Sequence, residues 1–165
     1  VRAFLFGSLP PSTVEESKQY IEKLHKQYIE NGIGRWTVIE IITGRIIGWA
    51  GLKIEINVNN HDSFYDLGYR FLPEFWNNGY ATEVSKALVK YGFELFQSKI
   101  NKIPIDKICG YTEANAIASQ KVLIKAGLHL VESFGEKHNL WYEISRDDWL
   151  LSRNEDGNKD LIVDK

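Results

Sequence analysis

The sequence predicts a mixed α/β (α+β) domain. Two observations support this fold class: apolar residues recur at helical spacing in two separate segments, and a β-branched segment runs into a Thr-Gly-Arg turn typical of a hairpin. The expected order is one helix, three strands, a second helix, a strand, a third helix and two further strands. A chain of 165 residues holds one such domain with a core, but not two of comfortable size.

The first helix is expected over 13–31. Ser12 and Glu15 have the spacing of a capping box, with Ser12 as the N-cap. Apolar residues then recur at helical spacing as far as Tyr28, and Gly32 stops the pattern.

Three strands are expected to follow. The first is rich in β-branched residues, and the turn Thr43-Gly44-Arg45 returns the chain as a hairpin. The polar stretch from Asn57 to Ser63 predicts a loop, and Pro73 ends the third strand. The three expected strands cover 35–43, 45 to about 55, and 64–72.

The second half of the chain alternates helices and strands. From Ala81 the apolar spacing is helical again. Asn115 is a good N-cap for the third helix, and Gly127 suits the C′ position that ends it. The expected elements are a helix over 81–97, a strand over 107–112, a helix over 115–126, and strands over 128–134 and 139–145.

The composition excludes several classes of protein. A formal net charge of −2 leaves no basic surface for nucleic acid, and the longest apolar runs, such as Ile46–Leu52, are far too short to cross a membrane. The single cysteine, Cys109, rules out an internal disulfide framework and suits the cytosol. The four histidines lack metal-ligand spacing, so no metal is expected. We therefore expect a soluble, cytoplasmic protein that binds neither nucleic acid nor membrane.

The sharpest local feature is the passage from strand to helix at Asn77-Asn78-Gly79-Tyr80-Ala81-Thr82. A helix that starts here presents unpaired backbone N–H groups and the positive end of its dipole, which together suit a phosphate. Gly79 allows close backbone approach, and the two asparagines tolerate unusual backbone angles. The alternative is a tight strand-to-helix turn without a ligand, since a lone glycine motif is a weak signal.

The surroundings of this turn carry a family resemblance. Residues 66–83, DLGYRFLPEFWNNGYATE, resemble the central motif of the GNAT acetyltransferase superfamily, most closely its RimJ/RimL-like branch, whose named members acetylate N-terminal amines of ribosomal proteins. Residues 116–128 are similar to the other helix of that branch, and 141–149 to its last strand. The resemblance implies the GNAT acyl-CoA N-acyltransferase fold, with a central, twisted, mostly antiparallel sheet flanked by helices, and acetyl-CoA as the co-substrate.

The resemblance also bears on the extent of the domain. Family members usually begin with a further strand and helix, and this chain is expected to start after them, in line with the absence of methionine. Residues 1–150 are therefore expected to be an N-terminally incomplete GNAT domain, and 151–165 a polar tail. The branch commonly has glycine where Asn77 stands, and Asn115 lies four residues before Ser119 instead of the usual three.

The resemblance implies three groups of contacts with CoA. The splayed strand before the turn offers backbone groups to the pantetheine arm and to the oxyanion of the tetrahedral intermediate. The turn holds the pyrophosphate, and Asn115 either contacts CoA or serves as a plain N-cap. The residues expected to bind CoA are Tyr69, Arg70, Phe71, Leu72, Asn77, Asn78, Gly79, Tyr80, Ala81, Thr82, Asn115 and Ser119.

Two carboxylates are candidates for the catalytic base. Asp66 lies on the strand that enters the turn, at the position where many superfamily members carry a base. A carboxylate of ordinary pKa is a poor base for an ammonium, so Asp66 would act through water or need a raised pKa. The alternative for Asp66 is a solvated strand residue or the partner of a nearby arginine. Glu143 is the rival acid, on the same strand face as Trp141.

Ser119 is expected to assist the leaving thiolate. Many superfamily members use a tyrosine four residues before the glycine that ends the last helix; that position is Leu123 here, and the branch has a serine in the preceding turn. The serine hydroxyl can hydrogen-bond the sulfur or relay a proton. The alternative is a helix-surface serine that bonds back to the chain. An acyl-enzyme on Cys109 is disfavoured, because no histidine lies near it in sequence and structural cysteines are usually buried.

The predicted function is transfer of acetyl from acetyl-CoA to a primary amine by direct attack in a ternary complex. The acceptor stays open between a protein N-terminus, which the branch favours, and a small amine such as a polyamine or an aminoglycoside. The choice between monomer and homodimer is also open. The alternative function is a non-catalytic acyl-CoA-binding or regulatory module. A generic nucleotide-phosphate binder is disfavoured because the sequence lacks a Gly-x-x-x-x-Gly-Lys-Ser/Thr motif.

Overall fold

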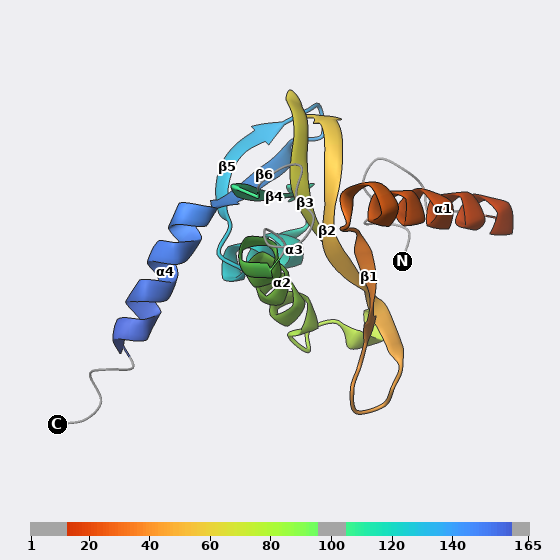
Figure 1. Cartoon of the computed structure of the whole chain (residues 1–165), viewed down its shortest axis with the longest axis horizontal. Helices are drawn as coiled ribbons and strands as arrows, with labels where there is room; N and C mark the ends of the chain where they lie inside the picture. The colour runs from red at the N-terminus through yellow and green to blue at the C-terminus, as the bar shows by residue number, and fades with distance from the viewer. Residues whose placement is uncertain (1–12, 96–104, 160–165) are drawn as a thin grey trace.

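A computed structural model describes residues 13–95 and 105–159, with side chains as far as Arg153. The helices are α1 (Val14–Asn31), α2 (Tyr80–Lys90), α3 (Ile117–Lys125) and α4 (Arg146–Lys159), and the strands are β1 (Arg35–Ile39), β2 (Ile46–Val58), β3 (His61–Phe71), β4 (Lys107–Glu113), β5 (His129–Phe134) and β6 (Asn139–Ser145). Helices α2 and α3 lie together against the sheet, α1 lies at its β1–β2 end, and α4 extends away from the β5–β6 end (Figure 1).

The strand order in the six-stranded sheet is β1-β2-β3-β4-β6-β5. All neighbouring strands are antiparallel except β3 and β4, which are parallel and connected through α2. The predicted mixed class, the mostly antiparallel sheet and the order of the elements through β6 are confirmed. Parallel pairing covers only Tyr65 with Ile108 and Asp66 with Cys109. Beyond those residues the two strands continue without pairing to each other.

The start of α1 differs by one residue from the prediction. Thr13 is the N-cap in place of Ser12: its Oγ1 accepts a hydrogen bond from the Glu16 amide at 3.1 Å, and Glu16 Oε2 accepts one from the Thr13 amide at 3.3 Å. The Thr13–Glu16 pair and the predicted Ser12–Glu15 pair both match the capping-box spacing, so spacing alone cannot separate them. Ser12 itself lies outside the described residues.

The connection between β2 and β3 is tighter than predicted. Val58 pairs with His61, so the loop expected over 57–63 is a two-residue turn at Asn59 and Asn60, with φ angles of 51° and 59°. Two successive positive φ angles match the twist of neighbouring antiparallel strands, and asparagine tolerates them better than most residues. Strands β2 and β3 are consequently longer than the predicted ones.

The end of the second helix also differs from the prediction. Helix α2 stops at Lys90 and continues as a π-helical turn over Tyr91–Leu95, whereas an α-helix was expected as far as Gln97, which lies outside the described residues. A side chain at Gly92 would meet Ile108 at 2.8 Å, so glycine here lets the turn pack directly on the sheet.

Helix α3 begins one residue later than its predicted cap. Ala116 is the N-cap, because its carbonyl accepts the first hydrogen bonds of the helix, from the amides of Ser119 at 2.9 Å and Gln120 at 3.1 Å. The predicted N-cap role of Asn115 is therefore wrong. Gly127 has a φ angle of 98°, the left-handed conformation expected of a C′ residue.

Helix α4 occupies the first part of the predicted polar tail. Ser145 caps it: the Asp148 amide donates to Ser145 Oγ at 3.1 Å, and the Ser145 hydroxyl donates to Asp148 Oδ2 at 2.6 Å. Trp149 is buried and anchors the first turn to the core. A polar sequence forms a helix here because its first turn is both capped and anchored. The helix runs to Lys159, and residues 160–165 lie outside the described part.

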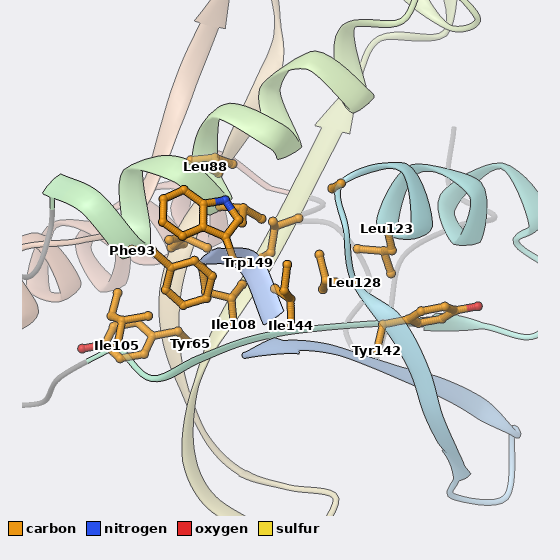
Figure 2. Close-up of a cluster of buried hydrophobic side chains, with 14 of the residues drawn as sticks. Tyr65, Leu88, Phe93, Ile105, Ile108, Leu123, Leu128, Tyr142, Ile144 and Trp149 are labelled. Carbon is orange, nitrogen blue, oxygen red and sulfur yellow. The ribbon is translucent and has the colours of Figure 1, made fainter. Parts of the chain in front are cut away.

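The hydrophobic core lies between the sheet and helices α2 and α3. Figure 2 shows side chains from both layers meeting there, with Trp149 beside Phe93; their ring centroids are 5.4 Å apart. Tyr65 and Leu67 of β3 face this core, whereas Phe64 and Asp66 face the other side of the sheet. None of the helices in the described part of the chain combines the length and the apolar character that crossing a membrane requires.

Candidate functional site

A gap opens between β3 and β4 at one end of the sheet. The last paired residues are Asp66 and Cys109, after which β3 continues to Phe71 and β4 to Glu113. Each strand then leads toward a helix, β3 to α2 and β4 to α3. The facing edges of these two strand ends are therefore not used by the β3–β4 ladder.

Alternate peptide groups of β3 face this gap. The Leu72 amide donates to the Ile47 carbonyl of β2 at 2.9 Å. Because peptide groups alternate in direction along an antiparallel strand, those of Arg70 and Leu72 point toward β2, and those of Tyr69 and Phe71 point into the gap. The backbone contacts predicted for this four-residue stretch are thus narrowed to two residues.

The indole of Trp76 engages one of these peptide groups. Its Nε1 donates to the Phe71 carbonyl at 2.9 Å, and the residue is 48% exposed. The amide of Phe71 and both polar atoms of the Tyr69 peptide still face the gap. Trp76 therefore ties the end of β3 to the turn that follows it.

The predicted phosphate turn is an exposed backbone loop with two left-handed residues. The φ angle is 62° at Asn77 and 85° at Gly79. Gly79 is the N-cap of α2, and no side chain of the described residues caps the amides of the first turn, which belong to Tyr80, Ala81 and Thr82. Bare amides at the positive end of a helix dipole form an anion site. Asn77 replaces the usual glycine by adopting a glycine-like φ angle.

The β1–β2 hairpin braces this turn. The Tyr80 hydroxyl donates to the carboxylate of Glu40. Arg45 pairs with Glu74 at 2.8 Å, and its guanidinium lies 4.8 Å from the centre of the Phe75 ring. These contacts were not predictable from the sequence, because Glu40 and Arg45 belong to a different hairpin and no local pattern marks them.

The hydroxyl groups of Tyr69 and Ser119 meet beside the gap. Tyr69 Oη lies 2.9 Å from Ser119 Oγ and 3.2 Å from the Ser119 carbonyl oxygen, and its one proton can be donated to either atom. Tyr69 projects from β3 and Ser119 from the first turn of α3, so the contact joins the two sides of the gap. The pKa of Tyr69 is raised to about 12, because the effect of burial exceeds the opposing effect of the hydrogen bond with Ser119. The sequence predicted a role for the backbone of Tyr69 but none for its side chain.

Asp66 lies on the opposite face of β3, where it forms an ion pair. Its side chain is buried, with the residue 7% exposed, and it pairs with Arg35. Arg35 also donates to the carbonyl oxygens of Gly51, of Asp66 at 2.9 Å and of Gly68 at 3.4 Å. Burial raises the pKa of Asp66, and the charge of Arg35 opposes that rise. The structure thus has the arginine partner that was one alternative for Asp66, and its role as a base stays a prediction.

Comparison with known proteins settles the family. Residues 1–129 match the family model described as an acetyltransferase (GNAT) domain. The chain belongs to the GNAT acetyltransferase family. The fold and the RimJ/RimL-like resemblance predicted from the sequence are thereby confirmed, and members of the family use acetyl-CoA.

The proteins similar to this GNAT chain carry several names. FsC-acetyl coenzyme A-N(2)-transacetylase of Aspergillus fumigatus is 29% identical over 133 residues, which cover 72% of this chain and 53% of that protein. A mutant spermidine N-acetyltransferase from Vibrio cholerae superposes with a TM-score of 0.63 at 18% identity, covering 91% of this chain and 85% of the other. Ribosomal-protein-S5-alanine acetyltransferase from Vibrio fischeri superposes with a TM-score of 0.62 at 17% identity, covering 85% and 79%.

Partial coverage and low sequence identity limit what these similarities show about the chain. The GNAT chain spans about half the length of the first curated relatives it matches, 53% and 52%. At 18% and 17% identity, the similarity to the two solved structures shows a shared fold and does not extend to substrate.

Glu143, the rival acid, is fully engaged within the GNAT domain. Its Oε2 pairs with Lys107 at 2.7 Å, and its Oε1 accepts a hydrogen bond from Trp141 Nε1 at 2.8 Å. Burial alone would raise the pKa of Glu143, but the hydrogen bonds from Lys107 and Trp141 hold it below the ordinary value. A carboxylate stabilised in its charged form is a weak proton acceptor, so the geometry disfavours Glu143 as the base.

Cys109 is a buried thiol in this GNAT domain. Its Sγ lies 3.9 Å from Glu143 Oε1, and burial together with that negative charge raises the pKa of the Cys109 thiol. The thiolate is the nucleophilic form of cysteine. A thiol held in its protonated form argues against an acyl-cysteine intermediate, as the sequence had indicated.

Asn115 lines a pocket between the end of β4 and the β5–β6 turn. The pocket has a volume of about 430 Å³ and is lined by Asn115, Glu113, Ala114, Lys137 and His138. Since Asn115 is not the N-cap, a contact with CoA is the role still predicted for it. Among the described residues, no group of three or more histidine, cysteine, aspartate and glutamate side chains is placed to hold a metal ion.

Proposed function

We propose that this GNAT domain transfers the acetyl group of acetyl-CoA to a primary amine by direct attack within a ternary complex. The main observation behind this proposal is that the gap between β3 and β4 leads directly to the turn before α2. The unpaired edge of β3 leads into the uncapped N-terminus of α2. A ligand with an extended, amide-bearing arm and a pyrophosphate at its end matches these two features in order.

In this proposal the backbone of the chain holds acetyl-CoA. The peptide groups of Tyr69 and Phe71 bind the pantetheine arm, and the amides of Tyr80, Ala81 and Thr82 bind the pyrophosphate. An amide that points into the gap is also suited to stabilise the oxyanion that develops on the thioester carbonyl. Fixing the thioester and the amine in one complex supplies much of the rate through positioning.

Asp66 is the proposed base, and Arg35 limits its strength. Burial raises the pKa of Asp66 and so favours proton uptake, whereas the guanidinium of Arg35 favours the unprotonated carboxylate. Asp66 and Ser119 lie on opposite faces of the sheet at the gap, so the amine and the leaving sulfur are served from opposite sides. Because Asp66 is buried, the proton reaches it through water.

Because Asp66 is paired with Arg35, the site favours an amine that is already neutral near pH 8 and needs no strong base to remove its proton. An α-amino group has a pKa of about 7.7–8.0, compared with about 10.4 for a lysine-type amine. At pH 8 about half of the first but under about 1% of the second is therefore neutral. A protein N-terminus is thus the acceptor that this site supports best, in line with the RimJ/RimL-like branch, and a small amine such as a polyamine is the alternative.

A thiol-release assay tests this function. The chain is incubated with acetyl-CoA and with peptides whose N-terminus is free, the same peptides with the N-terminus blocked, spermidine and an aminoglycoside. We expect CoA release with the free N-termini, at a rate that rises with pH up to about 8 as the α-amine loses its proton. Blocked peptides that carry a lysine are the control.

The same assay separates a second candidate function. The ion pair of Asp66 with Arg35 is the observation that favours a non-catalytic acyl-CoA-binding module, because it leaves the carboxylate engaged. Tight binding of CoA in a calorimeter, with no acetylation of any amine, would support that module and contradict the transferase.

A further inference from the structure

The Tyr69 side chain contacts the serine that is proposed to assist the leaving thiolate. Tyr69 Oη lies 2.9 Å from Ser119 Oγ and 3.2 Å from the Ser119 carbonyl oxygen. Both residues are half-buried, and they come from two different elements, β3 and α3. The contact therefore fixes the position of the serine relative to the strand edge that faces the gap.

The protons in this pair restrict its hydrogen bonds. Each hydroxyl has one proton to donate, and the serine carbonyl can only accept. If Tyr69 donates to the Ser119 carbonyl, Ser119 donates to Tyr69 Oη and the serine proton is consumed within the pair. If Tyr69 donates to Ser119 Oγ, the serine proton is free to point at a third atom. The direction of this one hydrogen bond decides whether Ser119 has a proton to offer a ligand.

The surroundings of Tyr69 keep its hydroxyl protonated. Burial raises its pKa to about 12, well above the value of about 8.5 for an ordinary thiol. A thiolate is too weak a base to take a proton from such a group. Tyr69 consequently acts as a hydrogen-bond donor that keeps its proton.

We propose that Tyr69 is a positioning residue for acetyl transfer: its hydroxyl donates to Ser119 Oγ and thereby directs the serine proton toward the sulfur of the departing CoA. This inference rests on the proposed function. In the step, the amine nitrogen bonds to the thioester carbonyl carbon, and the C–S bond breaks with its electron pair left on sulfur. The proton that the nitrogen loses balances the one that the thiolate finally gains. Ser119 stabilises the sulfur through a hydrogen bond, and Tyr69 acts only through Ser119.

The ionisation of the thiol of bound CoA reports on this hydrogen bond without an acceptor amine. CoA is bound to the wild-type chain and to the Tyr69→Phe, Ser119→Ala and double variants, with binding checked by calorimetry, and the ultraviolet absorbance of the thiolate is followed against pH. We expect the pKa of the bound thiol to rise by about one unit in Tyr69→Phe, because the thiolate loses an oriented donor. The double variant should match Ser119→Ala, since Tyr69 acts through the serine.

Two further variants control for structure. Tyr65→Phe removes a hydroxyl from the paired part of the same strand and should leave the pKa of the bound thiol unchanged. Ser119→Thr keeps a hydroxyl at the same place and should retain the wild-type value. In the thiol-release assay, Tyr69→Phe should lower kcat about fivefold with little change in KM for acetyl-CoA.

The outcomes separate this inference from the proposed function. A shift in Ser119→Ala with none in Tyr69→Phe would overturn the role of Tyr69 alone. So would an effect of Tyr69→Phe that is equally large when Ser119 is already alanine. No shift in Ser119→Ala would remove the leaving-group role of Ser119 and the inference with it. Failure of the wild-type chain to bind CoA would refute the proposed function itself.

Discussion

At the scale of single residues, the pKa values of two buried carboxylates on one face of the sheet are shifted in opposite directions. Burial raises the pKa of Asp66 against the charge of Arg35. Glu143 is also buried, but hydrogen bonds from Lys107 and Trp141 lower its pKa. Such divergence is common where one carboxylate must exchange a proton and another must stay charged. Asp66 also belongs to the last residue pair before the gap, which favours it as the base.

Replacement of Asp66 by asparagine tests its role as the base. The amide oxygen of Asp66→Asn can still accept a hydrogen bond from Arg35, so the fold should be kept, but it cannot take up a proton. We expect kcat/KM for acetyl transfer to fall about 100-fold across the pH range of the thiol-release assay.

Glu143→Gln is the matched control for that variant. It neutralises a second buried carboxylate on the same face of the sheet, at a position paired with Lys107, and should leave kcat/KM nearly unchanged. If Asp66→Asn retained the wild-type rate at every pH, Asp66 would be an ion-pair partner only, and the α-amine would lose its proton to solvent.

At the scale of elements, the turn between β3 and α2 is fixed by backbone conformation and by a neighbouring hairpin. Asn77 and Gly79 both have positive φ angles, and Glu40 of the β1–β2 hairpin accepts a hydrogen bond from Tyr80. A Cβ atom at Gly79 would meet no atom within 4 Å, so the left-handed φ angle alone favours glycine there. The geometry of the proposed anion site therefore depends on this one backbone conformation.

Replacement of Gly79 by alanine should weaken the binding of CoA. A left-handed alanine costs about 1 kcal/mol, and relief of that strain turns the first amides of α2 away from the phosphate. We expect the Kd for CoA, measured by calorimetry, to rise at least about fivefold.

Gly135→Ala offers a matched comparison. Gly135 also has a positive φ angle and a nearly open Cβ position, but it lies in the β5–β6 turn. Both variants should lose similar stability in urea unfolding, and only Gly79→Ala should lose affinity. Equal affinities in the two variants would mean that the turn does not hold the pyrophosphate.

At the scale of the whole molecule, the order of the elements through β6 and the family were predictable from the sequence. Helical spacing of apolar residues and turn residues are local signals, and the motif over 66–83 is contiguous. The start of α1 was ambiguous because two capping boxes overlap. Helix α4 was missed because its sequence is polar and, among its residues up to Arg153, only Trp149 is buried in the core.

The parts of the site that sequence could not supply are contacts between distant elements. The ion pair of Asp66 with Arg35 and the hydroxyl pair of Tyr69 with Ser119 join residues far apart in the chain. Which peptide groups face the gap depends on the register of β2 with β3, which no local pattern encodes. The sequence was therefore sufficient to predict the proposed binding site of acetyl-CoA. The fold was needed to show which ion pairs and hydrogen bonds the side chains of this site form.

Residue-resolved amide exchange, measured by NMR with and without CoA, tests the central claim most directly. Binding in the gap and at the turn should slow exchange at Tyr69, Phe71, Tyr80, Ala81 and Thr82, whose amides face the proposed ligand. The amides of Arg70 and Leu72 already bond to β2 and should change little. Protection of all residues of this strand alike, or protection confined to another part of the chain, would contradict the proposed site.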